Sequence, residues 1–474
     1  MDTKKLRQKI LDLAIHGKLV PQDPNDEPAS VLLERIHAEK EALIKEGKIK
    51  RTKKTTASDT SHYENVPFEV PDGWCWTTLG EIGTWQAGGT PSRMHKEYYG
   101  GNIPWLKTGD LNDGLITTIP EYITEEGLNN SSAKLNPAGS VLIAMYGATI
   151  GKVGILGIPA TTNQACCACV DYNGIIRKYL FYFLLSYKEE FIALGGGGAQ
   201  PNISKDIIVK TFIPVPPIQE QIRIVSEIEG LLALLDSLDN NKAALGNAIN
   251  QAKSKILDLA IHGKLTPQNP TDEPASELLK RINPKAIISC DNPQYGKVPL
   301  SWVISTVGEV FAINPKTHVE DDTEAAFVPM TCVADGYCNT FEYECRKWGD
   351  IKKGFVHFQD NDVAVAKISP CMENRKSVVF HDLPNGIGAG TTELNVFRCK
   401  EILPDYSLLY FKSQMFIGSC VGTYNGVVGQ QRVAKSFIQE LPIGIPPYNE
   451  QLRIVSKVND IFSRLDMIEK SLQA

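Results

Sequence analysis

Apolar residues recur at alternating spacings of four and three along the middle of the chain. This spacing is typical of a helix that packs along one seam of a coiled coil. The run begins after Pro216-Pro217, a favourable helix start, and ends near Gly263, a favourable helix end. At 1.5 Å per residue it predicts a central helix of about 50 Å. The seam comprises Ile224, Ile228, Leu231, Leu235, Leu238, Lys242, Leu245, Ile249, Ala252, Ile256 and Leu259.

Both ends of the chain carry the same apolar spacing. We expect an antiparallel coiled coil in which the central helix is one strand and the two terminal helices together form the other. The alternative is separate amphipathic helices, each packed on its own domain. The C-terminal seam comprises Ile454, Val458, Ile461, Leu465, Ile468 and Leu472, and the N-terminal seam comprises Leu6, Ile10 and Leu13.

Internal repeats relate these helices to one another. Residues 9–36 return at 255–282 with five differences in 28 positions, a displacement of 246 residues. Residues 216–228 return at 446–458, displaced by 230 residues, and a weaker pair links 70–82 to 298–310. The chain therefore resembles two copies of one unit joined in a circle, with the chain ends falling inside one copy of the long helix. We expect a pseudo-twofold, circular organisation.

Between the helices lie two blocks that differ inside the repeated frame. Both are rich in glycine, proline and β-branched runs, and each has one short aromatic helix pattern, at 179–187 and 406–413. We expect an α+β (mixed α/β) fold with two globular domains joined by a coiled coil. The predicted regions are 1–65 (N-terminal helical region with a basic linker), 66–214 (first domain), 215–297 (central helix and turn region), 298–445 (second domain) and 446–474 (C-terminal helix).

Composition narrows the function classes. The chain has 474 residues, 42% of them hydrophobic and 22% charged, as in ordinary globular proteins, and its net charge of −6 gives no overall attraction to nucleic acid. Its 11 cysteines match no zinc-site spacing, so we expect reduced thiols in a cytoplasmic protein. The N-terminus lacks the apolar core of a secretory signal, and no apolar stretch reads as a membrane helix.

Several strings together carry a resemblance to a known family. They are the proline-rich helix entrance ending in Glu220-Gln221, its copy at Glu450-Gln451, the repeated KILDLAIHGKL motif, GGTPS at 88–92 and GGNIPWLKTGDL at 100–111. The layout resembles the DNA-specificity subunits of Type I restriction–modification systems, and the resemblance covers essentially the whole chain.

The resemblance implies a division of labour between this chain and its partners. Two target recognition domains would each read one half of a bipartite site in double-stranded DNA, and the helical spacer would fix the gap. Two modification (methyltransferase) subunits would dock on the helices, and restriction (nuclease) subunits would join them. The chain itself would have no catalytic residue, metal or cofactor, because S-adenosylmethionine, ATP and Mg²⁺ would be used by the partner subunits. We expect no membrane association.

Two other classes of protein compete with this interpretation. A stand-alone DNA methyltransferase is suggested by Ile445-Pro-Pro-Tyr448, but the polar residue that should hold the target amine is replaced by Ile445. The copy at 215–218 lacks the aromatic residue that would stack on a flipped base. A pure coiled-coil scaffold explains the helices and leaves two large divergent domains without a role.

Candidate DNA contacts are polar and basic residues in glycine-rich loops. Asparagine and glutamine can pair bidentately with adenine, whereas arginine and lysine favour guanine or phosphate. The alternative for each is an ordinary solvated loop side chain. In the first domain they are Thr90, Ser92, Arg93, Lys96, Lys107, Thr108, Tyr146, Lys152, Asn163, Gln164, Gln200 and Asn202. In the second domain they are Lys367, Ser369, Asn374, Arg375, Lys376, Thr391, Thr392, Glu393, Gln430, Gln431 and Arg432.

A basic run follows the first repeat and has no copy after the second. It is either a solvated linker or an arm that contacts phosphates or a partner. Its members are Lys45, Lys48, Lys50, Arg51, Lys53 and Lys54. The near-identical turns at 21–33 and 267–279 suggest contact with two identical partner subunits or, equally, a shared packing role.

Overall fold

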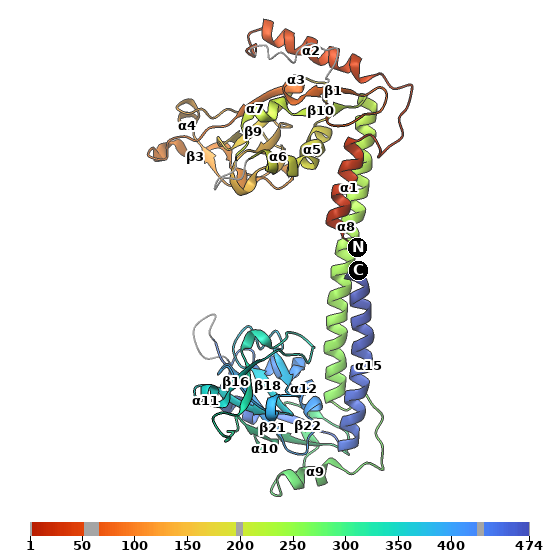
Figure 1. The fold of residues 1–474 in the computed structure, drawn as a ribbon, viewed down its shortest axis with the longest axis vertical. Helices are drawn as coiled ribbons and strands as arrows, with labels where there is room; N and C mark the ends of the chain where they lie inside the picture. The colour runs from red at the N-terminus through yellow and green to blue at the C-terminus, as the bar shows by residue number, and fades with distance from the viewer. Residues whose placement is uncertain (1, 52–65, 196–201, 424–430, 474) are drawn as a thin grey trace. The chain divides into compact units, whose positions relative to one another are not determined.

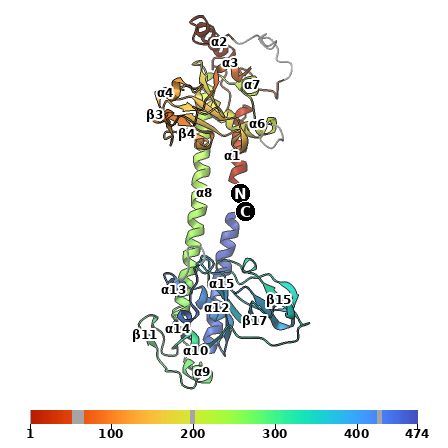
Figure 2. The same ribbon diagram turned by 90° about the vertical axis from the view of Figure 1, so that its left-hand side faces the viewer.

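The computed structural model describes residues 2–51, 66–195, 202–423 and 431–473. Helices and strands are mixed throughout, as the sequence predicts, and the chain divides into two compact units, Met1–Asn240 and Asn241–Ala474 (Figures 1 and 2). Each unit holds one globular domain together with one half of the central helix. The fold prediction of two mixed domains with a coiled coil is confirmed.

The first domain is built around a five-stranded sheet in the order β2-β9-β6-β7-β4. A smaller sheet has the order β5-β3-β8, and β1 pairs with β10. The strands are β1 Cys75–Thr78, β2 Gly83–Ala87, β3 Tyr99–Leu106, β4 Gly114–Ile116, β5 Tyr122–Ile123, β6 Val141–Ala144, β7 Val153–Leu156, β8 Thr161–Thr162, β9 Cys166–Asp171 and β10 Phe212–Val215. The helices are α2 Ala29–Lys45, α3 Leu79–Ile82, α4 Glu125–Asn129, α5 Arg177–Ser186, α6 Lys188–Leu194 and α7 Lys205–Lys210, with short 3-10 turns η1 Lys96–Tyr98, η2 Thr108–Asp110 and η3 Gly147–Thr149.

The second domain has two four-stranded sheets, β14-β21-β18-β19 and β16-β15-β20-β17, and the pairs β13-β22 and β11-β12. The strands are β11 Asp291–Asn292, β12 Gly296–Lys297, β13 Val303–Thr306, β14 Phe311–Ile313, β15 Glu324–Val328, β16 Glu344–Lys347, β17 Val356–Gln359, β18 Asp362–Ala366, β19 Ser377–Val379, β20 Ile387–Gly390, β21 Leu394–Cys399 and β22 Pro442–Ile445. The helices are α9 Ala275–Ile282, α10 Val307–Val310, α11 Trp348–Ile351, α12 Pro404–Lys412, α13 Gln414–Cys420 and α14 Lys435–Glu440, with 3-10 turns η4 Met330–Cys332 and η5 Pro384–Gly386.

The central helix α8 is continuous from Ile218 to Ile261. Helix α1 (Thr3–Ile15) lies along its first half, and α15 (Tyr448–Gln473) lies along its second half (Figure 1). Arg7 of α1 pairs with Asp236 at 2.7 Å, whereas the segment after α1 meets the start of α8, where Gln22 donates to Glu220. Residue numbers thus rise along one helix of the coiled coil as they fall along the other, so the two helices run antiparallel. The predicted antiparallel coiled coil is confirmed within each unit.

Burial along α8 follows the predicted seam only in part. Ile224, Ile228, Leu235 and Ile249 are buried in the seam. At the end of the helix, however, Leu257, Ala260 and Ile261 are the fully buried residues, because this end packs into the core of the second domain. The end of α1 behaves in the same way: its buried residues are Leu11, Ala14 and Ile15, which belong to the core of the first domain.

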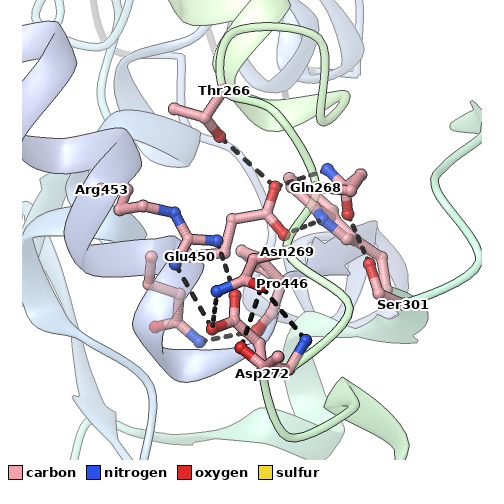
Figure 3. A network of polar contacts seen from close by, with 11 residues as sticks. Thr266, Gln268, Asn269, Asp272, Ser301, Pro446, Glu450 and Arg453 are labelled. Atoms are coloured by element: carbon pink, nitrogen blue, oxygen red, sulfur yellow. Dashed lines mark hydrogen bonds and ion pairs between the residues drawn. The ribbon is translucent and has the colours of Figure 1, made fainter.

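A buried carboxylate ties each domain to its coiled coil. Glu450, fully buried in the first turn of α15, accepts hydrogen bonds from Gln268 at 2.7 Å and from the indole of Trp302 at 3.0 Å. Figure 3 shows this network together with the ion pair between Arg453 and Asp272, which is 2.6 Å long. Burial raises the pKa of Glu450, and the two hydrogen bonds oppose that effect.

The first unit repeats the same network with its own residues. Glu220 accepts from Gln22 and from the indole of Trp74, each at 3.0 Å, and Arg223 pairs with Asp26 at 2.6 Å. These residues occupy the repeated positions of the sequence, so the repeats encode one connection that is built twice. Across the described residues, none of the helices combines the length and apolar character needed to cross a bilayer.

The two strings that resemble a methyltransferase motif are helix entrances. Val215 and Ile445 each end a strand, β10 and β22, and both are fully buried. The prolines that follow lead directly into α8 and α15. The structure therefore gives these strings a connecting role.

Candidate nucleic-acid interface

Three segments far apart in the sequence meet in the first domain. The main chain of Met145, after β6, accepts a hydrogen bond from Ile203 at 2.9 Å and donates one to Ala165, before β9, at 2.8 Å. Tyr146 and Asn202 form an isolated antiparallel bridge. We call residues 145–146, 163–165 and 202–203 the first loop junction.

The second domain repeats this arrangement with different side chains. Lys367, after β18, donates its main-chain N–H to Glu393 at 2.9 Å and accepts from Val433 at 3.0 Å. Ser369 donates to Gln431 at 2.9 Å, and Ile368 bridges Arg432. Residues 367–369, 391–393 and 431–433 form the second loop junction. Both junctions thus use one main-chain scaffold to present different side chains.

The first loop junction presents amides and a phenol, and the hydroxyl of Thr90 reaches it from a neighbouring loop. Tyr146, Gln164 and Asn202 are exposed, and Thr90 donates a hydrogen bond to Gln164. The Oδ1 atom of Asn163 is buried without a hydrogen-bond partner among the described residues. These groups both donate and accept hydrogen bonds, which is the chemistry that base edges require.

Glycines allow the neighbouring loop to approach this junction. A Cβ atom on Gly88 would lie 2.1 Å from the carbonyl oxygen of Thr162, and one on Gly89 would lie 2.3 Å from the nitrogen of Ala133. Only a residue without a side chain fits at either position. The Gly88-Gly89 pair therefore explains how Thr90 reaches Gln164.

The other predicted residues of the first domain lie around the junction or farther along its loops. Lys107 forms an ion pair with Glu121, and Thr108 begins η2. Leu106, just before Lys107, accepts a hydrogen bond from the main chain of Asn163 at 2.9 Å. Lys152 lies in the turn between β6 and β7. Ser92, Arg93 and Lys96 are exposed along the loop before β3.

A charged pair dominates the second loop junction. Arg432 donates two hydrogen bonds to the carboxylate of Glu393, at 2.7 and 2.8 Å. The guanidinium holds the pKa of Glu393 below its ordinary value. Thr391 caps this segment by accepting from the main chain of Glu393 at 3.2 Å, and Thr392 is exposed. The pair therefore offers an ordered set of donors and acceptors with little net charge.

Three predicted residues of the second domain lie in a turn with other partners. Lys376 donates to the carbonyl oxygen of Val333 at 2.7 Å and pairs with Asp335 at 3.5 Å. Arg375 donates to the carbonyl oxygen of Lys412 at 3.1 Å, while the side chain of Asn374 is exposed. Arg375 and Lys376 thus hold a neighbouring loop of their own domain. Gln200 and Gln430 lie outside the described residues.

Sequence reasoning missed two residues that the structure places beside this turn, Tyr337 and Lys412. Lys412 is 2% exposed and ends the aromatic helix α12. The position of Lys412 at the end of an apolar helix pattern could have identified it from the sequence. No feature of the neighbouring sequence distinguishes Tyr337. No group of three or more acidic, histidine or cysteine side chains able to hold a metal occurs among the described residues.

Comparisons with known proteins all indicate the same family. Residues 71–251 and 299–474 match the family described as Type I restriction modification DNA specificity domain. The chain is 41% identical over 241 residues to the Type I restriction enzyme EcoEI specificity subunit of Escherichia coli, covering 47% of this chain and 40% of that one. The corresponding EcoAI subunit, also from Escherichia coli, is 41% identical over 241 residues, covering 47% and 41%. These two matches span about two fifths of the relatives' length.

Longer matches extend over most of the chain. The EcoKI specificity subunit of Escherichia coli K12 is 22% identical over 419 residues, 85% of each chain. A solved structure described for complex assembly and conformational transition of the type I R-M system has a TM-score of 0.57, with 16% identity, covering 86% of this chain and 94% of that one. This likeness shows the same fold.

Proposed function

Because this chain belongs to the family of Type I restriction–modification DNA specificity proteins, we propose that it reads a bipartite target in double-stranded DNA, one half with each domain. The observation that carries the proposal is the pair of loop junctions. Their main-chain hydrogen bonds match, while their side chains differ. One scaffold with two sets of side chains suits one task performed on two different sequences.

The side chains at each junction suit direct readout in a groove. Gln164 and Asn202 can each form bidentate hydrogen bonds with adenine. Arg432 can donate to guanine, and Glu393 can accept from cytosine. A good bidentate contact discriminates against a wrong base by about 1–3 kcal/mol. Exposed basic residues of the same domain, such as Arg93 and Lys96, would contact phosphates and set the register.

The coiled coil would set the distance between the two half-sites. A helical spacer fixes this gap geometrically, as the dimer spacing does in simpler DNA-binding proteins. Two linked readers also bind more tightly than either alone, because the second event becomes intramolecular.

The repeated frame supports two copies of one partner. Ile222 and Leu452 occupy matching positions in the first turns of α8 and α15 and are 47% and 46% exposed. Two similar apolar side chains beside two matching buried networks would present a similar surface twice. We assign these surfaces to two modification (methyltransferase) subunits, with restriction subunits joining the complex.

Catalysis would belong to those partners. In this proposal the chain carries no catalytic step, and S-adenosylmethionine, ATP and Mg²⁺ are bound by partner subunits. The complex would act on DNA in the cytoplasm without a membrane.

A single substitution at one junction tests the proposal. With the partner methyltransferase present, Gln164→Ala should weaken or relax one half of the methylated motif by about 1–3 kcal/mol, that is about 5- to 150-fold, and leave the other half unchanged. Asn129→Ala, exposed in the same domain, is the matched control. Unchanged preference at both halves would contradict the assignment of Gln164, and unselective DNA binding by the parent complex would favour a scaffold.

A further inference from the structure

Tyr337 connects the second domain to both strands of the coiled coil. Its ring makes an edge contact with Phe462 of α15, with 5.5 Å between the ring centroids. The ammonium group of Lys253, in α8, lies 6.0 Å from the centre of the same ring. The Tyr337 hydroxyl lies 3.4 Å from the carbonyl oxygen of Asn250, also in α8. One side chain of the domain is thus seated between two helices.

The loop that carries Tyr337 is held firmly from the domain side. The buried ammonium group of Lys412 donates to the carbonyl oxygens of Gly336 and Arg375, at 2.8 and 3.0 Å. The guanidinium of Arg375 lies 4.9 Å from the centre of the Tyr337 ring, and its Nη2 donates to Gln414 at 2.8 Å. The Tyr337 ring therefore has two cations near it, Arg375 from the domain and Lys253 from the coiled coil.

The first unit has a matching segment that ends in strand β4, and among the described residues no such ring contact is found there. Leu111-Asn-Asp-Gly-Leu115 follows η2 as Val333-Ala-Asp-Gly-Tyr337 follows η4. Leu115, the counterpart of Tyr337, is 61% exposed. The repeat displacements make Leu232 the counterpart of Phe462 and Arg7 the counterpart of Lys253. The seat for an aromatic ring is therefore specific to the second unit.

The first domain contacts its helix in another way. Helix α5 packs against α1, and Gln8 donates to the carbonyl oxygen of Ser186 at 3.2 Å. In the second unit the counterpart of Gln8 is Ser254, whose short side chain lines a concavity of about 630 Å³ between α8 and the domain. Tyr337 lines the same concavity. The ring thus lies at a concavity between α8 and its own domain.

We propose that Tyr337 is a positioning residue that holds the second recognition domain at a fixed angle on the coiled coil and thereby restricts the gap allowed between the two DNA half-sites. This inference rests on the proposed function. Tyr337 itself does not read bases: it acts through the orientation of the domain. Removing the ring would leave the half-site sequences unchanged and widen the range of gaps.

The test uses the full chain with its partner methyltransferase and duplexes whose gap is the native length, one base pair shorter or one longer. The parent complex should methylate the native gap selectively. Tyr337→Ala should lose at least about tenfold of that preference, the loss of about 1.4 kcal/mol. Tyr337→Phe keeps the ring contacts and should retain the parent preference, and so should Leu115→Ala at the exposed counterpart.

A second variant approaches the same contact from the spacer. Phe462→Leu introduces the side chain type that the first unit carries at Leu232, so the coiled coil tolerates it, and it should relax the gap as Tyr337→Ala does. The inference would be overturned if Phe462→Leu kept the gap preference of the parent complex. It would also be overturned if either variant recognised altered half-site sequences. Absence of any bipartite motif in the parent complex would instead overturn the proposed function, which separates the two failures.

Discussion

Trp302 donates its indole N–H to the carboxylate of Glu450 at 3.0 Å, in a site where both side chains are buried. Trp74 and Glu220 form the same contact at 3.0 Å in the first unit. In both cases a residue at the edge of a domain is fixed to the first turn of a long helix. Each unit therefore uses one buried carboxylate to join its domain to the coiled coil.

Removing this carboxylate should destabilise the second unit. Glu450→Ala leaves the indole N–H of Trp302 and the amide of Gln268 buried without their acceptor, at about 1–3 kcal/mol for each unsatisfied group. Differential scanning calorimetry should show a lower transition for that unit. Glu440→Ala, an exposed glutamate in the same unit, should leave the transition unchanged, and equal effects of the two variants would contradict the account.

The ion pair between Lys253 and Asp466 should contribute modestly to the coiled coil. Lys253 is buried, but half of the Asp466 side chain is exposed, so solvent screens the pair. Asp466→Lys should lower the free energy of unfolding by about 1 kcal/mol at low salt. The loss should shrink at 1 M salt, where the Debye length is about 3 Å. Asn459→Lys, exposed on the same helix, is the control. A loss independent of salt would indicate a packing effect.

Lys412 predicts a specific pH dependence. Burial lowers the pKa of Lys412 from its ordinary 10.5 to about 7, and the charge of Arg375 acts in the same direction, while Asp335 and Cys338 oppose it. Between these values the unfolded chain binds more protons than the folded one. The free energy of unfolding should therefore rise with pH between about 7 and 10.5, by at most about 1.4 kcal/mol per pH unit.

Chemical denaturation at several pH values tests this sign. Lys412→Met should remove the rise attributed to the lysine, whatever its effect on stability at a single pH. Lys400→Met, an exposed lysine in the same unit, should keep the parent slope. If Lys412→Met retained the full slope, the buried ammonium group would not be its source.

The basic run after the first repeat should contribute to affinity without contributing to selectivity. Of its described members, Lys48 pairs with Glu46 at 2.8 Å and Arg51 pairs with Glu41 at 2.6 Å, while Lys53 and Lys54 lie outside the described residues. Replacing the six cations by glutamine should weaken DNA binding and flatten its dependence on salt, because fewer counterions are released. A changed sequence preference would contradict a phosphate-contacting role.

The sequence predicted the helical frame well because its repeats and heptads are local patterns. The predicted seam did not include Leu257 and Leu11, which are buried because the end of each helix packs into a domain core. Periodicity alone cannot show which neighbour a helix packs against. The circular relation between the chain ends stays a prediction.

The candidate site was less accessible to sequence reasoning. Loop residues such as Tyr146 and Asn202 could be selected by type, and the structure places them together. The ion pair between Arg432 and Glu393, and the use of Lys376 inside the domain, depend on contacts between distant segments. Tyr337 was invisible because its neighbours come from two helices that lie far from it in the chain.

The most direct test of the central claim is the genome-wide DNA methylation pattern of the source cell, with and without this gene. The account predicts that deletion removes one bipartite methylated motif and that the lost motif reveals both half-sites and their gap. An unchanged pattern in a cell whose partner methyltransferase is active would contradict the claim that this chain selects the DNA target.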